Sequence, residues 1–199
     1  MKVFHLNGPA PLETNSFVLV GEGNKAVVID PAPSLAAFDK LLEGEGASLE
    51  AILLTHGHYD HMTGLPALQK RWNCPVYLDP ADARSTQLMP AGPGTLGYTD
   101  GETLSLAGLS ITTWHTPGHS RGSWVLYCEG LLFTGDTLFA GDVGRTDLAG
   151  GSWQEMCRSL AKLRALPLPD DTQVLPGHGP FSTLGEEKAS NPYLNVKEN

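Results

Sequence analysis

The sequence predicts an α/β protein in which two β-sheets pack together with helices on the outside. Short apolar runs of strand length interleave with segments of helix length, and this order of elements occurs twice along the chain. The 199 residues include 41% hydrophobic and 18% charged side chains, which suits a folded core and argues against a disordered tail protein. We therefore expect one domain over residues 1–199, built from two similar halves.

Each predicted strand is a short apolar run bounded by Gly, Pro or polar residues. The runs are at 2–6, 16–20, 25–29, 51–55 and 75–78 in the first half, and at 103–106, 111–114, 124–127, 131–133 and 172–175 in the second. Gly21-Glu22-Gly23-Asn24 is a turn signal between the second and third strands. Val27-Val28-Ile29 is continuous rather than alternating, which is typical of a strand covered on both faces.

Polar residues in front of the remaining segments predict helix N-caps. The expected helices are 35–42 after Ser34, a helix after Thr63 that ends near Arg71, 153–166 after Ser152, and a helix after Ser182 that ends near Ser190. Residues 89–101 are expected to form a loop, because they are rich in Gly and Pro.

Charge and composition argue against several classes of protein. The 13 Lys and Arg against 22 Asp and Glu give a formal net charge of −9, whereas a protein that grips nucleic acid normally carries a basic face. No apolar run approaches the roughly 18 residues of a membrane span. Cys74, Cys128 and Cys157 form no C-x-x-C pair, which argues against disulfides and zinc knuckles. The amino terminus lacks the features of a signal peptide, so we expect a cytoplasmic protein with no nucleic-acid or membrane partner.

The chemistry of the chain is concentrated in its histidines. His56-Gly57-His58-Tyr59-Asp60-His61 contains three of the seven His of the chain. At this composition an H-x-H-x-D-H pattern arises by chance in about five of ten thousand such chains. The pattern follows the predicted strand at 51–55, and ligands of open sheets gather beyond the carboxyl ends of strands.

The spacing within this turn suits two metal ions. Imidazole nitrogens and carboxylate oxygens are ligands for Zn and Fe. His56 and His58 lie two residues apart, as on one side of an extended turn, and would bind one metal together. Asp60 and His61 are displaced along the turn and would bind a second metal about 3.5–4 Å from the first.

Further strand ends each deliver a His or an Asp beside glycine. These residues are His119, Asp136 and His178, and with the turn they make five His and two Asp. Taken singly, His178 would more often be structural and Asp136 a turn former. Taken jointly, the set indicates a two-metal site. We expect His5 to be a surface or packing residue, and His115 to support the site from outside or to shape a turn.

In order and spacing, over nearly the whole chain, these residues resemble the metallo-β-lactamase superfamily. The resemblance implies a four-layer αββα sandwich with the metals at the sheet edge. It also divides the ligands: His56, His58 and His119 for the first metal, Asp60, His61 and His178 for the second, and Asp136 as the bridge.

The second half is similar to the short, glyoxalase II-like (hydroxyacylglutathione hydrolase-like) bacterial members of that superfamily. The motifs that carry this likeness are Gly135-Asp136-Thr137-Leu138-Phe139, Gly144-Arg145-Thr146-Asp147, Pro176-Gly177-His178-Gly179-Pro180, Ser182-Thr183-Leu184-Gly185-Glu186 and Asn191-Pro192-Tyr193. The chain departs from the longer glyoxalase II enzymes, because the helical C-terminal extension that helps to bind glutathione is missing. Asp142 also stands where a small neutral residue is commoner.

The resemblance implies a binuclear metal-dependent hydrolase of thioesters, with S-lactoylglutathione as the expected kind of small-molecule substrate. Two divalent metal ions per chain, Zn first with Fe or Mn as alternatives, would lower the pKa of a bridging water. The hydroxide beside Asp60 and Asp136, the expected catalytic residues, would attack the thioester carbonyl. The leaving thiolate has a pKa of about 8.5 and needs little help from a general acid. We expect a monomer or a small homo-oligomer.

Substrate contacts are predicted from residues that follow the ligands. The candidates are Arg145, Phe139, Tyr98 and Tyr193, with Arg121 as a weaker one. Arg145 would clamp a substrate carboxylate, or else form an ion pair with Asp147 or Asp142. The aromatic residues would line a pocket, although aromatic side chains more often belong to the core.

Other functions stay open. A persulfide dioxygenase would use a single iron held by His56, His119 and Asp136, so metal content separates it from a binuclear hydrolase. Hydrolases of lactones, lactams or phosphodiesters share the fold, and a non-catalytic metal module would need a closed site. A classical β-lactamase is disfavoured, because its turn generally lacks a His after the Asp, whereas His61 follows Asp60. No G-x-S-x-G motif is present, which argues against a serine nucleophile.

Overall fold

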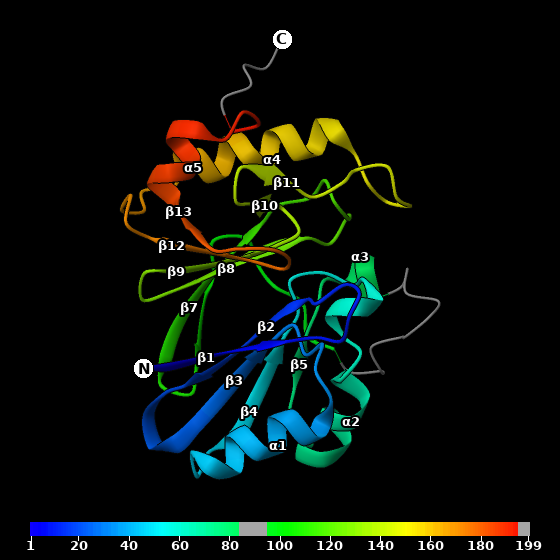
Figure 1. Ribbon diagram of the computed structural model, residues 1–199, viewed down its shortest axis with the longest axis vertical. Coiled ribbons are helices and arrows are strands. Elements are labelled where there is room, and N and C mark those ends of the chain that lie inside the picture. Colours follow the sequence, from blue (N-terminus) through cyan, green and yellow to red (C-terminus); the bar gives the residue numbers. More distant parts are fainter. Residues whose placement is uncertain (84–94, 195–199) are drawn as a thin grey trace.

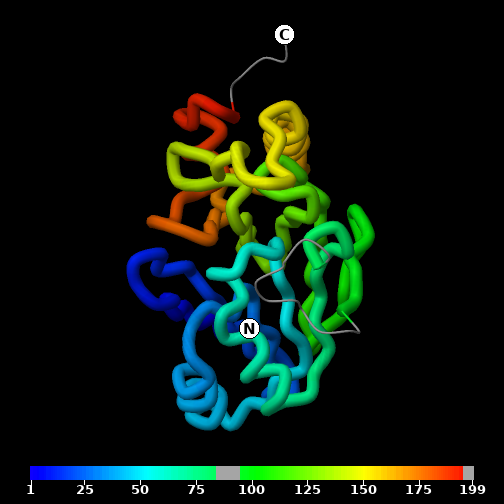
Figure 2. The backbone as a smooth tube through the Cα atoms, turned by 90° about the vertical axis from the view of Figure 1, so that its right-hand side faces the viewer, coloured from blue at the N-terminus to red at the C-terminus, as the bar shows by residue number. Residues whose placement is uncertain are grey.

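Two β-sheets pack face to face in the computed structural model, which describes residues 1–83 and 95–194. Helices cover the outer surface of each sheet, so the layers run helix, sheet, sheet, helix (Figure 1). The view turned by 90° shows the same arrangement, with helices at the top and bottom of the molecule (Figure 2). This confirms the predicted α/β sandwich.

The first sheet is mixed and has the strand order β1-β2-β3-β4-β5. Its strands are β1 (Lys2–Asn7), β2 (Asn15–Val20), β3 (Lys25–Ile29), β4 (Ser48–Leu53) and β5 (Val76–Tyr77). β1 pairs antiparallel with β2, and β2 with β3, the latter as the turn at 21–24 predicts. β3, β4 and β5 pair parallel. Helices α1 (Leu35–Gly44) and α2 (Leu65–Trp72) form the crossovers and pack Phe38 and Leu68 against the outer face.

The second sheet has the strand order β13-β12-β9-β8-β7-β6. Its strands are β6 (Thr103–Leu106), β7 (Leu109–His115), β8 (Trp124–Cys128), β9 (Leu131–Gly135), β12 (Gln173–Pro176) and β13 (Ser182–Thr183). Neighbours are antiparallel except for β9 and β12, which are parallel. Helices α4 (Trp153–Ala165) and α5 (Leu184–Ser190) cover its outer face. A separate ribbon is formed by β10 (Leu138–Phe139) and β11 (Asp142–Val143).

Burial on both faces explains the continuous apolar run of β3. Val27 and Ile29 face the second sheet, whereas Val28 belongs to the core beneath α1 and α2. Phe17 on β2 meets Phe133 on β9 across the sheet interface, with ring centroids 5.0 Å apart. Since these side chains are almost fully buried, the hydrophobic effect stabilises the contact between the sheets as well as the contact with the helices.

The predicted strands agree with the structure except at some boundaries. The strand expected at 51–55 spans Ser48–Leu53 instead. It ends early because the N–H of Thr55 donates to Asp30 Oδ1 at 2.8 Å rather than to a neighbouring strand. Six further short elements were not predicted, since they are too short to show a period. They are β10, β11, β13, α3 (Pro80–Ala83), and the 3₁₀ turns η1 (Glu22–Asn24) and η2 (Tyr59–His61).

Two of the four predicted helix caps are correct in position. Ser152 precedes α4, and its side chain accepts a hydrogen bond from the N–H of Glu155, as predicted. Ser34 stands at the N-cap of α1, but its side chain makes no cap hydrogen bond there.

The other two cap predictions are wrong. Gly64 is the N-cap of α2, because the hydroxyl of Thr63 donates to the carbonyl of Ala32 and so fastens the turn to another loop. Thr183, not Ser182, caps α5, since α5 begins at Leu184 and the Thr183 side chain accepts a hydrogen bond from the N–H of Glu186.

Part of the predicted loop at 89–101 lies outside the described residues, which resume at Thr95. Leu96 forms a parallel bridge to Tyr77 at the edge of the first sheet, and a turn at residues 100–101 leads toward β6. Among the described residues, no helix is long and apolar enough to cross a membrane.

Candidate metal centre

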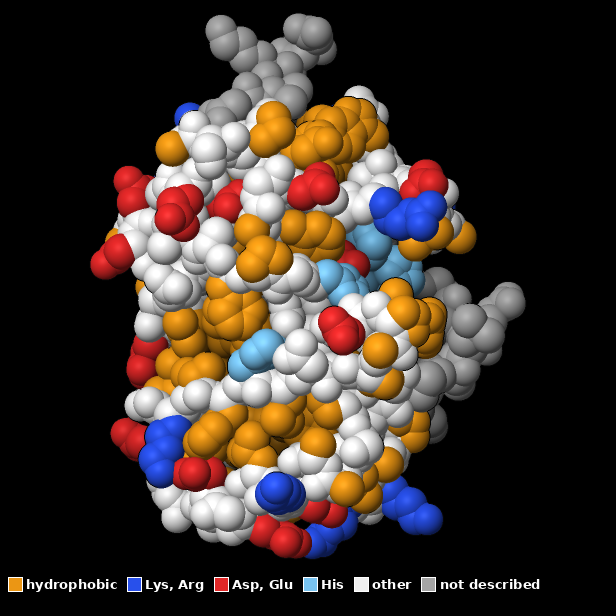
Figure 3. All heavy atoms as spheres, viewed as in Figure 1, with side chains coloured by type: hydrophobic (Ala, Val, Ile, Leu, Met, Phe, Trp, Pro, Cys, Tyr) orange, Lys and Arg blue, Asp and Glu red, His pale blue; other side chains and the backbone are white. Residues whose placement is uncertain are grey.

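The turns that carry the predicted ligands lie together at one edge of the two sheets. Strands β7, β9 and β12 point in one direction, because β7 and β9 are both antiparallel to β8 and β12 is parallel to β9. The first sheet is tied to this edge by two backbone hydrogen bonds. Trp124 N–H donates to the carbonyl of Thr55 at 2.8 Å, and Asn15 N–H donates to the carbonyl of Gly177 at 2.7 Å. Figure 3 shows histidine side chains grouped at the surface between the two halves of the molecule.

Two glycines allow the turns to come this close. Gly135 has a φ of +48°, and a Cβ there would collide with the side chain of Thr55 on the opposite turn. A Cβ on Gly177 would collide with Asp136 Oδ1 and with the ring of His61. The glycines beside the predicted ligands therefore leave room for the cluster of side chains.

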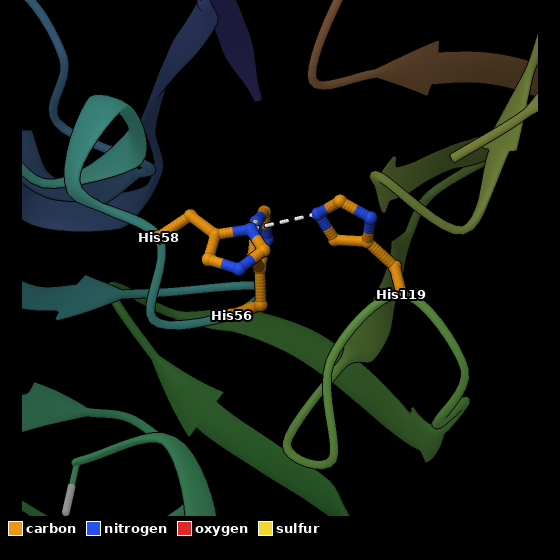
Figure 4. Close-up of side chains that lie close together, drawn as sticks. All are labelled: His56, His58 and His119. Carbon is orange, nitrogen blue, oxygen red and sulfur yellow. Dashed lines mark hydrogen bonds between the residues drawn. The ribbon is translucent and has the colours of Figure 1, made fainter. Parts of the chain in front are cut away.

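The first predicted ligand group is a triad of histidines. His56 Nε2 lies 3.1 Å from His58 Nδ1, which in turn lies 2.8 Å from His119 Nε2. His56 and His58 come from the turn after β4, whereas His119 comes from the turn after β7, so the triad spans both sheets (Figure 4). These nitrogen atoms lie within 4.8 Å of one another.

The second predicted group contains Asp60, His61 and His178. His178 Nε2 lies 3.2 Å from Asp60 Oδ2, and His61 Nε2 lies 3.7 Å from the same oxygen. Asp136 stands between this group and the triad. Its Oδ1 lies 3.3 Å from His61 Nε2, while its Oδ2 lies 3.3 Å from His119 Nε2 and 3.7 Å from His178 Nε2.

Hydrogen bonds on the far side of the rings orient the histidines. In His61, His119 and His178, Nδ1 is bonded to an oxygen outside the cluster, so Nε2 points into it, whereas His58 turns its Nδ1 toward the other two rings of the triad. The pairs are His61 with Asp30 Oδ2 at 2.9 Å, His119 with the carbonyl of Arg145 at 2.7 Å, and His178 with the carbonyl of Leu12 at 3.0 Å. The hydroxyl of Thr14 donates to Asp60 Oδ2 at 2.9 Å and fixes that carboxylate in the same way.

The donor set fits divalent metal ions. His61 Nε2 and Asp136 Oδ1 are buried and have no hydrogen-bond partner among the described residues, although they lie 3.3 Å apart. A buried polar atom without a partner is costly, and a shared cation would satisfy both. Nitrogens that share a tetrahedral Zn at about 2.05 Å lie about 3.3 Å apart. The 2.8 and 3.1 Å separations in the triad are close to that spacing.

The carboxylates of the cluster are ionised. Burial opposes the charge on Asp136, but the facing His61 holds the pKa of that carboxyl well below its usual range. Burial also opposes the charge on Asp60, yet the hydrogen bond with His178 lowers the pKa of Asp60 to about 2. Both groups can therefore act as anionic ligands at neutral pH.

The histidines of the cluster divide into two kinds. Burial lowers the pKa of His56 and of His58, so both rings are neutral and ready to bind a metal. Burial acts in the same direction on His61, but the charges of Asp136 and Asp30 outweigh it and raise the pKa of His61 well above its ordinary value. A cation bound at His61 would therefore displace a proton.

A family model matches the chain over residues 9–178, and its description is the metallo-beta-lactamase superfamily. The chain belongs to the metallo-β-lactamase superfamily. Its four layers are those of the metallo-β-lactamase fold, as the resemblance in the sequence implied. The His and Asp cluster at the edge of its sheets suits a divalent metal site.

Several bacterial members of the superfamily are similar over nearly their whole length. The "probable metallo-hydrolase YqgX" of Bacillus subtilis is 34% identical over 201 residues, which cover 93% of this chain and 94% of that protein. The "hydroxyacylglutathione hydrolase GloC" of Haemophilus influenzae is 30% identical over 201 residues, with the same coverage of both chains. The superfamily members similar to this chain thus include a hydroxyacylglutathione hydrolase.

Solved structures of the superfamily agree with the fold. A crystal structure described as the BLEG-1 B3 metallo-β-lactamase is 34% identical, with a TM-score of 0.86, and the match covers 98% of this chain and 100% of that one. TTHA1623 in a di-iron-bound form is 35% identical, with a TM-score of 0.81 and coverage of 96% and 99%. ETHE1 from Myxococcus xanthus is 29% identical, with a TM-score of 0.79 and coverage of 96% and 84%.

The predicted substrate residues are not gathered in one place. Phe139 lies beside the cluster, with its ring centroid 6.2 Å from that of His178. Tyr98 turns inward and donates its hydroxyl to the carbonyl of Leu54 at 3.0 Å, so it supports the turn before His56 rather than lining a pocket. Tyr193 packs edge-on against Trp153 on the outside of the second sheet's helical layer.

Arg145 forms the ion pair that was the alternative to a substrate clamp. Its guanidinium donates to both carboxylate oxygens of Asp147 at 2.7 Å, and both side chains are largely exposed. Asp142 instead accepts from the N–H of Val143 and is not the partner of that pair.

Two histidines stand outside the cluster, as expected. His115 Nε2 bonds to the carbonyl of Arg121 at 3.0 Å and so shapes the turn that carries His119. His5 packs against Phe17 and Phe181, with ring centroids 5.4 and 5.0 Å away.

Two buried aspartates of the site were missed by sequence analysis. Asp30 accepts hydrogen bonds from both Thr55 and His61, and it directly follows the buried strand β3. Like Asp136 it stands at a strand end, but its neighbours are Ile29 and Pro31 rather than glycine, so the pattern that singled out Asp136 did not select it. Asp82 lies on the short helix α3 and bonds to the turns after β4 and β7. Nothing in the local sequence around Asp82 signals that role.

Proposed function

We propose that the protein is a binuclear metal-dependent hydrolase of thioesters, with S-lactoylglutathione-like substrates. The observation that carries the proposal is the position of Asp136. Its two oxygens face different histidines, His61 on one side and His119 on the other, at 3.3 Å in both cases. A carboxylate between two ligand groups could serve both of two adjacent metal ions.

In this proposal, His56, His58 and His119 hold one ion, Asp60, His61 and His178 hold the other, and Asp136 holds both. When bound, divalent ions at such a site supply Lewis acidity and make hydroxide available near neutral pH. Asp60, fixed by Thr14, and Asp136 hold negative charge next to the place where the carbonyl carbon is attacked.

Two of the three cysteines are poor candidates for a catalytic nucleophile. Cys74 and Cys128 are buried, and burial raises the pKa of each thiol to about 11. Neither side chain therefore offers a thiolate at neutral pH.

A thioester suits the residues around the cluster. Its leaving thiolate has a pKa of about 8.5, so it departs without a dedicated general acid. The similarity to GloC, which is described as a hydroxyacylglutathione hydrolase, supports this substrate class. Phe139 beside His178 offers an apolar wall, and Arg145 offers a cation to an anionic thiol carrier once it leaves Asp147.

The proposal is tested by hydrolysis of S-D-lactoylglutathione, followed as loss of the thioester absorbance. We expect metal-loaded protein to reach a kcat/KM of about 10⁴ M⁻¹s⁻¹ or more. The Asp136→Asn variant should lose activity by about a hundredfold or more and bind less metal, because the amide cannot bridge two cations. If wild-type protein binds two metal ions but does not hydrolyse this thioester, the proposed substrate is wrong.

Metal content separates the hydrolase from a dioxygenase. Elemental analysis should find two metal ions per chain, and the di-iron form of the similar TTHA1623 makes iron a candidate beside zinc. One iron per chain together with persulfide-dependent oxygen uptake would support the dioxygenase instead.

Hydrolysis of β-lactams is a second candidate. The sequence disfavours it, but the 34% identity with BLEG-1 over 98% of the chain reopens the question. Turnover of a chromogenic cephalosporin faster than turnover of the thioester would favour this function, whereas the reverse order supports the thioesterase.

A further inference from the structure

One buried carboxylate outside the ligand set joins two ligand-bearing turns. Asp82 lies on α3 and is only 3% exposed. Its Oδ2 accepts a hydrogen bond from the N–H of Gly57 at 2.8 Å, and its Oδ1 accepts one from the N–H of Gly122 at 2.8 Å. Gly57 stands between His56 and His58, so the first bond holds the backbone that carries both rings.

A serine strengthens the link to the second turn. Ser120 directly follows His119, and its hydroxyl donates to Asp82 Oδ2 at 2.7 Å. The N–H of Ser120 donates to the hydroxyl of Ser123 at 3.1 Å, which closes the turn on itself. The carboxylate of Asp82 is thus bonded to Ser120, the residue after His119, and to the backbone of Gly122 in the same turn.

We propose that Asp82 is a positioning residue for the histidine triad. The turn after β4 belongs to the first sheet and the turn after β7 to the second, so neither turn alone sets the separation between His58 and His119. Asp82 sets it by bonding both turns to one rigid group. The inference rests on the metal centre of the proposed function. It states that Asp82 increases the affinity of the protein for one of the two ions.

The other ligand group is held by different residues. Asp30 orients His61, Thr14 fixes Asp60, and a backbone carbonyl orients His178. A change at Asp82 should therefore weaken one metal-binding step much more than the other.

The contacts require a carboxylate rather than an amide. Both oxygens of Asp82 accept hydrogen bonds, and the donors include two backbone N–H groups that cannot turn away. In Asp82→Asn, the amide nitrogen must face at least one of these N–H groups. The two turns should then move apart, while the size of the side chain is unchanged.

Stepwise metal affinity tests the inference. Metal-free wild type and Asp82→Asn are titrated with Zn²⁺ in competition with a chromophoric chelator, and Co²⁺-loaded samples give the electronic spectrum of the bound ion. We expect one binding step to weaken by about 10- to 100-fold, as for other residues that orient metal ligands, and the other to change by less than about threefold. The Co²⁺ spectrum should change for the weakened step.

Asp79→Asn is the matched control. Asp79 lies three residues earlier, and its carboxylate accepts from Trp124 Nε1 at 2.9 Å and from the N–H of Ala81 at 2.7 Å. Asp79 therefore lies close to Asp82 in the chain, but these two hydrogen bonds involve neither Gly57 nor Gly122. We expect both metal-binding steps of this variant to match those of wild type.

Two results would overturn the role of Asp82: wild-type affinity in both steps, or equal loss in both steps, which a general loss of folding would cause. If Asp82→Asn does not fold, Ser120→Ala removes one of the bonds and should weaken the same step by about three- to tenfold, and no change there would overturn the role. A wrong substrate would be recognised separately from a wrong role of Asp82, because wild type would then bind two ions without hydrolysing thioesters. Wild type that binds no divalent ion would overturn the centre itself.

Discussion

A single side chain, Asp136, connects the two ligand groups of the candidate centre. Its place directly after β9, with His61 and His119 on either side, follows from the packing of one sheet edge against the other. Around it, His61, His119 and His178 are each held at Nδ1 by an oxygen from a different loop. The residues thus act as a set that only the assembled sandwich brings together.

Arg145 gives a prediction at this scale. Arg145→Ala should raise the KM for an anionic thioester about three- to tenfold and leave a neutral thioester unchanged, because only the anion needs a guanidinium partner. Asp147→Asn should lower the KM for the anionic thioester, since it releases Arg145 from an exposed ion pair. Steady-state kinetics with both substrates check this, and equal effects on the two would remove Arg145 from substrate binding.

At the scale of elements, the helix starts show how the surroundings decide a cap. A Ser or Thr before an apolar run is a fair sign of a cap, and Ser152 fulfils it. Thr63 is taken by a contact with Ala32, so Gly64 stands at the start of α2. Thr183 rather than Ser182 caps α5, because it stands directly before Leu184 and forms the capping box with Glu186. The contact of Thr63 is long-range and leaves no trace in the local sequence.

The cap of α5 can be tested directly. Thr183 and Glu186 form a reciprocal capping box, so Thr183→Ala should lower the free energy of unfolding by about 1 kcal/mol. Ser182→Ala is the matched control and should change it by less than about 0.5 kcal/mol, because Ser182 Oγ is buried and has no hydrogen-bond partner within residues 1–83 and 95–194. Urea unfolding measures both. A larger loss in the Ser182 variant would contradict this assignment of the cap.

The contact between α4 and β7 gives a pH-dependent prediction. Lys162 donates to Asp100 Oδ1 at 2.6 Å and to the carbonyl of His115 at 2.9 Å. Burial opposes the charge on Asp100, but the bond from Lys162 outweighs it and lowers the pKa of that carboxyl. Because the folded pKa is below the unfolded value of about 3.9, the stabilisation is present above that pH and is lost as pH falls through the folded pKa.

Asp100→Asn should therefore destabilise the protein by about 0.5 kcal/mol at pH 7 and pH 5, a small effect because the pair is partly exposed. The difference from wild type should shrink below pH 4. Urea unfolding at pH 7, 5, 4 and 3 tests the sign, and a difference that grows toward low pH would contradict it.

At the scale of the whole molecule, the candidate centre links the two sheets. One half of the chain supplies His56, His58, Asp60 and His61, and the other supplies His119, Asp136 and His178. Bound ions should therefore stabilise the folded state as a whole.

The prediction of one domain over residues 1–199, with cytoplasmic location and a monomer or small homo-oligomer, stays a prediction.

Removal of metal by a chelator should lower the unfolding temperature. Each ion present at about a thousand times its dissociation constant adds about 4 kcal/mol, which corresponds to about 8–16 °C per ion for a domain of this size. Differential scanning calorimetry before and after chelation measures the shift, and added Zn²⁺ should reverse it. An unchanged unfolding temperature in protein shown to be metal-free would contradict the link between the sheets.

The sequence by itself determined the ligand types, their positions after strands, and the alternation of elements in two halves, because these are local features. Val27-Val28-Ile29 predicted burial on both faces, and the His56–His61 turn predicted metal chemistry. Only the tertiary structure decided how Asp30 and Asp82 serve the site, where Tyr98 and Tyr193 lie, and which partner Arg145 takes. These contacts join residues far apart in the chain or depend on which way an exposed side chain turns, and no local pattern specifies either.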